Sequence, residues 1–280
     1  MKNLLLVFLL LSSFSQAQLL YQITGNGLTE ASFLFGTIHM LPQEQFELSN
    51  SLKRAFDASA TVAMEVDLNM SGAEKIAIAQ KVLLPEGKTL KDYMAEQDYL
   101  QLKMYCMDSL QWNEAKFERS SKLKPMFFSS ILMQESMSKM ASYEMEFNKM
   151  AKKKNKKTMG LETIDFQLGL FDQLPMQTQV DMLKKDYNSD LKTFDTLLAC
   201  YLQEDLEKLN ILMNAETEAY PEFNELLLIN RNKSWIAPMG TQMRKESTFF
   251  AVGAGHLGGP QGVISLLRSA GYTVTAIKQN

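Results

Sequence analysis

The chain has 280 residues, with 29 basic and 32 acidic side chains, two histidines and two cysteines. Its formal net charge of −3 argues against a general nucleic-acid-binding protein. Two cysteines are too few for a cysteine-rich zinc site, so any metal must be held by histidine and carboxylate.

The first 17 residues, MKNLLLVFLLLSSFSQA, predict a secretory signal peptide. A lysine provides the basic start, Leu4 to Leu11 form the apolar core, and Ser15 and Ala17 are the small residues before a cut after Ala17. This stretch is too short to span a membrane, and no other stretch is long and apolar enough. We therefore expect a periplasmic or secreted mature chain of residues 18–280 without a transmembrane segment.

The two cysteines, Cys106 and Cys200, would lie in an oxidising compartment after export. One disulfide between them is therefore possible. Nothing in the sequence shows that they are adjacent in the fold, so paired and free states both stay open.

The first predicted strands form a hairpin that leads to a histidine. Leu20 to Thr24 and Ser32 to Phe35 have strand character, with the turn Gly25-Asn26-Gly27 between them. Gly36 follows directly, and His39 lies three residues later in a loop. A glycine after a buried strand lets the backbone turn tightly or come close to a ligand.

The next unit predicts a helix and then a strand that carries a carboxylate. Ser49 is the expected N-cap of a helix through Phe56, and residues 61–66 form the strand. A carboxylate at Glu65, inside this apolar run, is costly to bury unless it is paired, hydrogen-bonded or bound to a metal. Glu65 is therefore a candidate site residue, with Asp67 ranked behind it. The alternative is an exposed position or an internal ion pair.

The middle of the chain is predicted to be mainly helical, at about 71–157 and 166–245. A short strand between these stretches ends in a carboxylate, Glu162. A helix that opens at Pro221 carries Arg231, whose planar guanidinium suits a carboxylate or a developing oxyanion. Ordinary surface pairing of this arginine is the alternative.

The C-terminal segment repeats the arrangement of glycine and histidine. A strand from Thr248 ends at Gly253, and His256 lies three residues later in a glycine-rich loop without a P-loop lysine. Ligands in open α/β sheets bind at the carboxyl ends of strands, so loops from both chain ends could form one site around His39 and His256. Alternatively, each histidine is satisfied by hydrogen bonds within its own loop.

The order of these elements predicts a single α/β domain over residues 18–280. A helix over Val263 to Ser269 and a strand over Tyr272 to Ile277 complete it. We expect a mixed central sheet built from both chain ends and flanked by helices, with a large helical insertion.

Five stretches together resemble the TraB/PrgY/GumN family, which includes the TIKI metalloproteases. They are LFGTIHM with Gly36 and His39, AMEVDL with Glu65, GLET with Glu162, the stretch with Arg231, Asn232 and Trp235, and VGAGHLGGPQGVISLLRSAGY with Gly253 and His256. The resemblance spans nearly all of the mature chain. Two Gly-x-x-His motifs at opposite ends, with the glutamate between them, are more specific than either alone.

The resemblance implies a divalent-metal-dependent hydrolase, and peptide cleavage is the activity of the TIKI branch. The hypothesis makes His39 and His256 metal ligands and Glu65 a ligand or general base. Glu162 is assigned as a base or as support for a ligand, and Arg231 as support for a substrate carboxylate or an oxyanion. Imidazole and carboxylate suit manganese, cobalt or zinc and leave coordination positions for water.

The expected partner is a peptide or protein substrate, and no nucleic acid. Two other functions stay open. The same site could hold a metal or a peptide in a periplasmic binding module without cleavage, or it could hydrolyse a small ester, because a fold does not fix the bond that is attacked.

Overall fold

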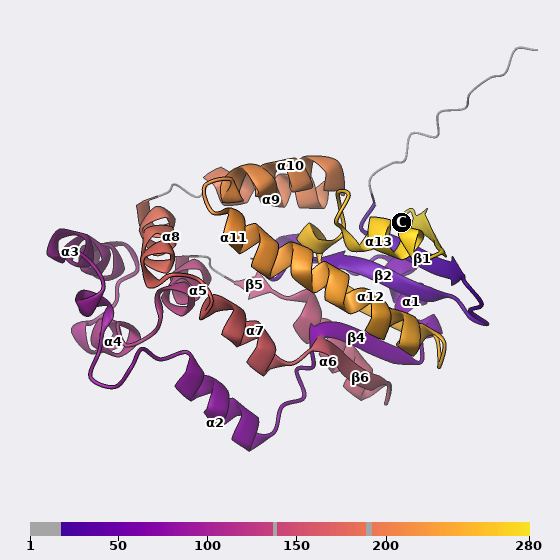
Figure 1. The fold of residues 1–280 in the computed structure, drawn as a ribbon, viewed down its shortest axis with the longest axis horizontal. Coiled ribbons are helices and arrows are strands. Elements are labelled where there is room, and N and C mark those ends of the chain that lie inside the picture. The colour runs from indigo at the N-terminus through magenta and orange to yellow at the C-terminus, as the bar shows by residue number, and fades with distance from the viewer. Residues whose placement is uncertain (1–17, 137–138, 189–191) are drawn as a thin grey trace, which may run out of the picture.

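A computed structural model describes residues 18–136, 139–188 and 192–280 (Figure 1). The predicted signal peptide, residues 1–17, lies outside this part of the chain. A six-stranded sheet has the order β6-β4-β7-β2-β1-β8. Its strands are β1 (Leu20–Gly25), β2 (Ser32–Thr37), β4 (Thr61–Val66), β6 (Lys157–Glu162), β7 (Thr248–Gly253) and β8 (Tyr272–Ile277).

Four neighbouring strands of this sheet run parallel. β4 pairs in parallel with β6 and with β7, and β2 pairs in parallel with β7. β1 pairs antiparallel with both β2 and β8, so the sheet is mixed. This confirms the predicted α/β class and the contribution of both chain ends. The carboxyl ends of β6, β4, β7 and β2 consequently lie at one edge of the sheet.

The structure confirms the opening hairpin and its turn. Leu20 faces Phe35 and Ile23 faces Ser32 across the antiparallel pair. Gly25 and Gly27 have φ values of +78° and +77°, in the left-handed region that glycine adopts without strain. The turn residues therefore account for the tight reversal before β2.

Helices cover the sheet and extend beyond one end of it. α1 (Asn50–Ala58) begins as predicted at Ser49, whose hydroxyl accepts the N–H of Leu52 at 3.1 Å. Every residue of β2, β4 and β7 is buried, as expected for parallel strands covered on both faces. The other α-helices are α2 (Gly72–Lys81), α3 (Glu96–Met104), α4 (Glu114–Ser120), α5 (Pro125–Ser136), α6 (Tyr143–Lys153), α7 (Ile164–Phe171), α8 (Met176–Asn188), α9 (Lys192–Leu202), α10 (Leu206–Thr217), α11 (Pro221–Asn224), α12 (Asn230–Met243) and α13 (Val263–Ser269).

The buried hydrophobic side chains form two clusters. One lies on the sheet and includes Phe35, Trp235 and Phe249. The second lies among α3, α4, α5 and α8, which we call the helical lobe, and includes Phe117 and Phe128. Figure 1 shows the helical lobe gathered at the end of the molecule away from β8. Part of the predicted helical insertion thus has a core of its own.

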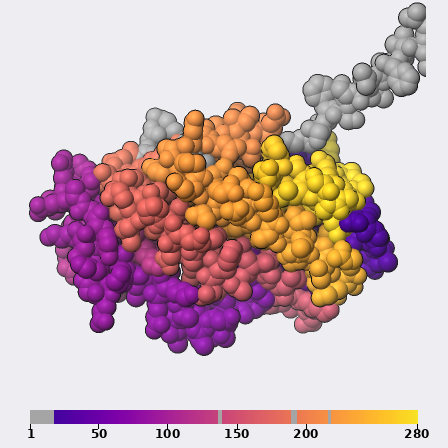
Figure 2. All heavy atoms as spheres, viewed as in Figure 1, coloured from indigo at the N-terminus to yellow at the C-terminus, as the bar shows by residue number. Residues whose placement is uncertain are grey.

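Figure 2 shows all atoms of the same face as spheres, where α11 and α12 in orange lie between the helical lobe and the yellow C-terminal segment.

Within the described ranges, no helix has the length and apolar character needed to cross a bilayer.

Both cysteines are buried and free of a disulfide. Cys106 belongs to the core of the helical lobe, whereas Cys200 belongs to the core on the sheet. Burial raises the pKa of the Cys106 thiol to about 12. This thiol is therefore protonated and unreactive at neutral pH.

We expect the folded protein to react slowly with a thiol reagent at pH 8, because neither sulfur is exposed. In denaturant without reductant, both thiols should react. The measurement is thiol titration with and without denaturant. Thiols that become titratable only after reduction would instead indicate a disulfide.

Candidate functional site

The predicted site residues lie together at the carboxyl edge of the parallel strands. Glu162 is the last residue of β6, and Glu65 is the last but one of β4. His39 lies two residues after the end of β2. Gly253 ends β7, and His256 follows in the 3-10 turn Ala254–His256. We call His39, Glu65, Glu162, Arg231 and His256 the strand-end site.

The three candidate metal ligands surround one point beside Gly253. A Cβ atom placed there would lie 3.2 Å from Glu65 Oε1, 3.5 Å from His256 Cδ2 and 3.9 Å from His39 Nε2. The φ of Gly253 is −53°, which other residues also adopt, so glycine is favoured here by the close approach of the Glu65 carboxylate and not by a left-handed backbone. The Gly253 N–H also donates to Glu65 Oε1 at 2.8 Å. At Gly36 a Cβ would overlap the Leu257 side chain, so this glycine too serves close packing.

The guanidinium of Arg231 joins the carboxylates and one histidine. It is 6% exposed, and its Nε and Nη2 donate to Glu162 at 2.6 to 3.2 Å. Nη2 also donates to Glu65 Oε2 at 2.6 Å. Nη1 donates to the Leu227 carbonyl at 2.9 Å and lies 3.2 Å from His256 Nε2. All five N–H groups of the arginine are therefore used inside the protein.

Arg231 lies just after a π-helical turn in an otherwise continuous helix. α11 continues through a π-helical turn, Glu225–Ile229, into α12, and the Asn230 N–H reaches the Glu225 carbonyl. Such turns are frequent at functional sites. One helical turn after Arg231, Trp235 Nε1 donates to Glu162 Oε2 at 3.1 Å. The Arg-Asn-x-x-Trp stretch thus turns one helix face toward the carboxyl edge of the sheet.

His256 is held as one neutral tautomer. The Asn232 Nδ2 group donates to the Gln261 carbonyl at 2.9 Å, which directs Asn232 Oδ1 toward His256 Nδ1 at 2.6 Å. Because that oxygen can only accept, Nδ1 carries the proton and Nε2 keeps a lone pair. The Arg231 N–H beside Nε2 agrees with this tautomer. Burial lowers the pKa of His256 to about 3, so the ring is neutral at pH 7.

His39 has a different partner. Its Nδ1 lies 3.2 Å from Glu144 Oε1, and an ionised carboxylate only accepts, so Nδ1–H is the donor. The hydrogen bond from the ring to Glu144 raises the pKa of His39 to about 9. The side chain is 71% exposed. His39 therefore forms the solvent-exposed side of the strand-end site, while Glu65 and His256 form its buried side.

The charge state of Glu65 follows from its neighbours. Burial alone would raise the pKa of this carboxyl. The positive charges of His39 and Arg231 and the N–H of Gly253 outweigh burial and hold the pKa at about 2. Glu65 Oε2 also accepts from Gln167 Nε2 at 3.2 Å. Glu65 is thus an ionised, buried and paired carboxylate, which decides against the exposed position considered from sequence.

Sequence reasoning missed two residues that contact the site, Glu144 on α6 and Gln167 on α7. No local motif marks either one, because each reaches its partner only through the tertiary fold. Asp67, ranked behind Glu65, accepts from the Thr158 hydroxyl at 3.1 Å and takes no part in the hydrogen bonds of the strand-end site.

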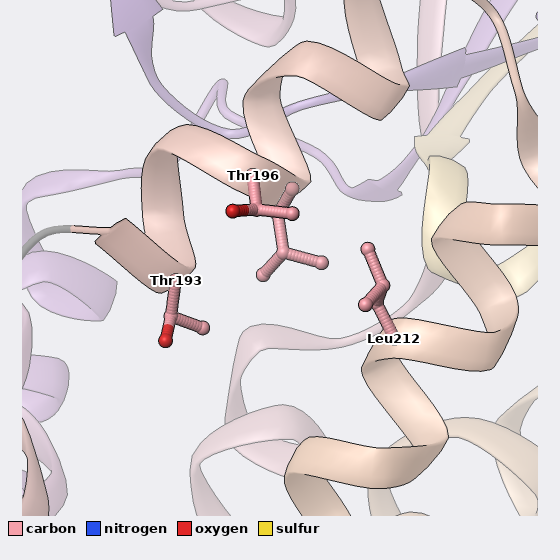
Figure 3. A pocket seen from close by; sticks show the side chains of 4 residues that line it. Thr193, Thr196 and Leu212 are labelled. Carbon is pink, nitrogen blue, oxygen red and sulfur yellow. The ribbon is translucent and has the colours of Figure 1, made fainter.

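Across residues 18–136, 139–188 and 192–280, no group of three or more histidine, cysteine or acidic side chains already has the geometry of a metal site. His39, Glu65 and His256 nevertheless provide two imidazole nitrogens and a carboxylate, a donor set that suits manganese, cobalt or zinc. A small cavity of about 130 Å³ lies elsewhere, between α9 and α10 (Figure 3). Thr193, Thr196, Leu197 and Leu212 line it, and none of these belongs to the strand-end site.

Replacing Arg231 with alanine should lower the free energy of unfolding by about 3 to 5 kcal/mol, because two buried carboxylates lose their cation. Lys233→Ala on the same helix is the matched control. Lys233 lies 4.0 Å from Glu225 in an exposed pair, so its loss should change stability by less than about 0.5 kcal/mol.

Urea unfolding of both variants at pH 7 measures this difference. Equal, small effects for Arg231→Ala and Lys233→Ala would show that the buried network does not stabilise the fold.

Comparison with known proteins identifies one family over nearly the whole chain. The model of the TraB/PrgY/gumN family matches residues 19–276, from β1 into β8. Searches of curated proteins and of solved structures gave no match. The matched region contains both Gly-x-x-His motifs and every residue of the strand-end site. The chain therefore belongs to the TraB/PrgY/gumN family.

Proposed function

We propose that this chain is an exported, divalent-metal-dependent hydrolase that cleaves peptide bonds. The observation that carries the proposal is the position of His39, Glu65 and His256 around one point beside Gly253. They come from the ends of three adjacent parallel strands, the part of an α/β sheet where ligands bind.

The hydrogen bonds at Nδ1 of the two histidines support a metal at that point. His39 Nδ1 donates to Glu144 and His256 Nδ1 donates to Asn232, so Nε2 is the nitrogen left for coordination on each ring. Histidines that bind metals commonly donate their other N–H to a carboxylate or a carbonyl in this way. His39, Glu65 and His256 would therefore hold manganese, cobalt or zinc.

Two groups must give way when a cation binds. The Arg231 N–H has to leave the lone pair of His256 Nε2, and His39 has to release the proton that it holds on Nε2 at neutral pH. Arg231 would keep its bonds to Glu162 during this change. Without metal, Arg231 therefore occupies the lone pair of His256, and a proton occupies that of His39.

When bound, the metal would polarise the scissile carbonyl and lower the pKa of a water molecule. Glu65 suits the role of ligand better than that of general base, because a carboxylate with a pKa of about 2 is a weak proton acceptor. Arg231 donates to both Glu162 and Glu65, and Trp235 donates to Glu162, so Glu162 supports the arginine that holds Glu65 in place. Arg231 or Glu162 would have to give up one of these hydrogen bonds before it could act on a substrate.

Support for a peptide substrate comes from the resemblance to the TIKI metalloproteases. The exposed side chain of His39 also makes this side of the site accessible from solvent. The binding module and the small-ester hydrolase are the rival functions. Metal analysis together with digestion of a peptide library separates both of them from a peptidase.

His39→Ala and His256→Ala should each lose most of the metal bound by the wild type and most of its peptide hydrolysis, because each removes one of three ligands. Asp67→Asn is the matched control. It changes a carboxylate near the end of the same strand as Glu65 but outside the hydrogen bonds of the site, so it should keep both properties.

Metal content measured on protein purified without chelator, and a peptide library digested and analysed by mass spectrometry, provide the readouts. Unchanged turnover in either histidine variant would eliminate the assignment. A wild type that binds metal but leaves the whole library intact would favour the binding module, and cleavage of small esters alone would favour the esterase.

A further inference from the structure

α6 places a carboxylate against the strand-end site although its sequence carries no motif for it. Glu144 lies in the first turn of this helix, 105 residues after His39 in the chain. Its side chain is 17% exposed and close to the exposed ring of His39. Neither the glycine–histidine motifs nor the other stretches that resemble the family include it.

The hydrogen bonds of Glu144 fix its orientation. Oε1 accepts from the Thr37 hydroxyl at 2.6 Å and from His39 Nδ1 at 3.2 Å. Oε2 accepts from the Ser142 hydroxyl at 2.9 Å. Both oxygens are therefore engaged by donors from β2, from the loop after it and from the N-cap of α6.

The backbone holds the partners of this bond together. Leu41 and Pro42 (β3) pair antiparallel with Met140 and Ala141 (β5), which lie just before α6. This short pair connects the loop that carries His39 to the segment that carries Glu144. The backbone N–H of Gln43 also donates to the Lys139 carbonyl at 2.9 Å.

The core of the sheet anchors the helix itself. The ring centroid of Tyr143 lies 5.2 Å from that of Phe35, and the ring of Phe147 lies 5.9 Å from it. Both α6 residues are buried, so the first turn of the helix cannot rotate without disturbing the core. Glu144 is thus presented from a rigid support.

We propose that Glu144 is a positioning residue that aims His39 Nε2 at the point shared with Glu65 and His256. Because His39 is 71% exposed, packing does little to fix its ring, and the bond at Nδ1 does so instead. Glu144 contacts the Nδ1 side of the imidazole, so it acts through His39 and not as a fourth ligand. The role in metal binding rests on the function proposed above, whereas the orientation of the ring does not.

The test compares Glu144→Ala and Glu144→Gln with the control Glu146→Gln. Glu146 lies two residues further along α6 and pairs with Lys149 at 3.4 Å, away from His39. Isothermal titration with Co²⁺ gives the dissociation constant of each variant. Crystal structures of the metal-free proteins give the orientation of the His39 ring.

Loss of such a partner typically weakens metal binding about 10- to 100-fold, and we expect this range for Glu144→Ala. Glu144→Gln should lose less, since its amide oxygen still accepts the N–H. Glu146→Gln should match the wild type. In the metal-free Glu144→Ala crystal, His39 Nε2 should no longer point toward Gly253.

Glu144→Ala binding Co²⁺ within twofold of the wild type would overturn the proposal. If the wild type binds no Co²⁺, the metal-dependent function fails, and the crystal structures alone decide the role of Glu144. A His39 ring unmoved in Glu144→Ala would then overturn it. Glu144→Gln serves for both measurements if the alanine variant does not fold.

Discussion

The buried guanidinium of Arg231 is the interaction on which the strand-end site depends. Parallel pairing of β4 and β6 brings Glu65 and Glu162 to neighbouring strand ends, where two unpaired carboxylates would be costly. Arg231 donates to both, and Trp235 and Gly253 add one N–H each. Arg231, whose N–H groups all have partners inside the protein, therefore mainly sets the arrangement of charges at this edge of the sheet.

This network still leaves the site negative. One guanidinium opposes the charges of Glu65 and Glu162, and Glu144 adds a further carboxylate beside His39. In the metal-free protein, the protonated His39 ring supplies positive charge, and its pKa of about 9 reflects its bond to Glu144. A divalent cation would meet the same demand more completely. Under the proposed function, the cation would lie on the side of His39 that faces Gly253.

The sequence predicted the parts of this arrangement that have local signals. Glycine before each histidine, a glutamate inside an apolar strand and a serine before an amphipathic helix are each readable within a few residues. The parallel order of the strands then brings His39 and His256 together from opposite ends of the chain. The mixed sheet could be predicted because its strands at both chain ends are also recognisable within a few residues.

Other contacts depend on tertiary structure and have no such signal. Glu144 reaches His39 because β3 pairs with β5 and α6 packs on Phe35, and helical periodicity does not reveal this pairing. Gln167 reaches Glu65 only because α7 follows β6, which pairs with β4. Periodicity also could not show that the helical lobe has a separate core, or that Cys106 and Cys200 belong to different clusters.

Anomalous diffraction from crystals soaked in a manganese or cobalt salt would locate the proposed metal directly. We expect one strong peak in each chain beside Gly253. His39 Nε2, His256 Nε2 and an oxygen of Glu65 should each lie about 2.0 to 2.3 Å from it. A peak bound by other residues, or none at the strand ends while Arg231 still donates to His256, would contradict it.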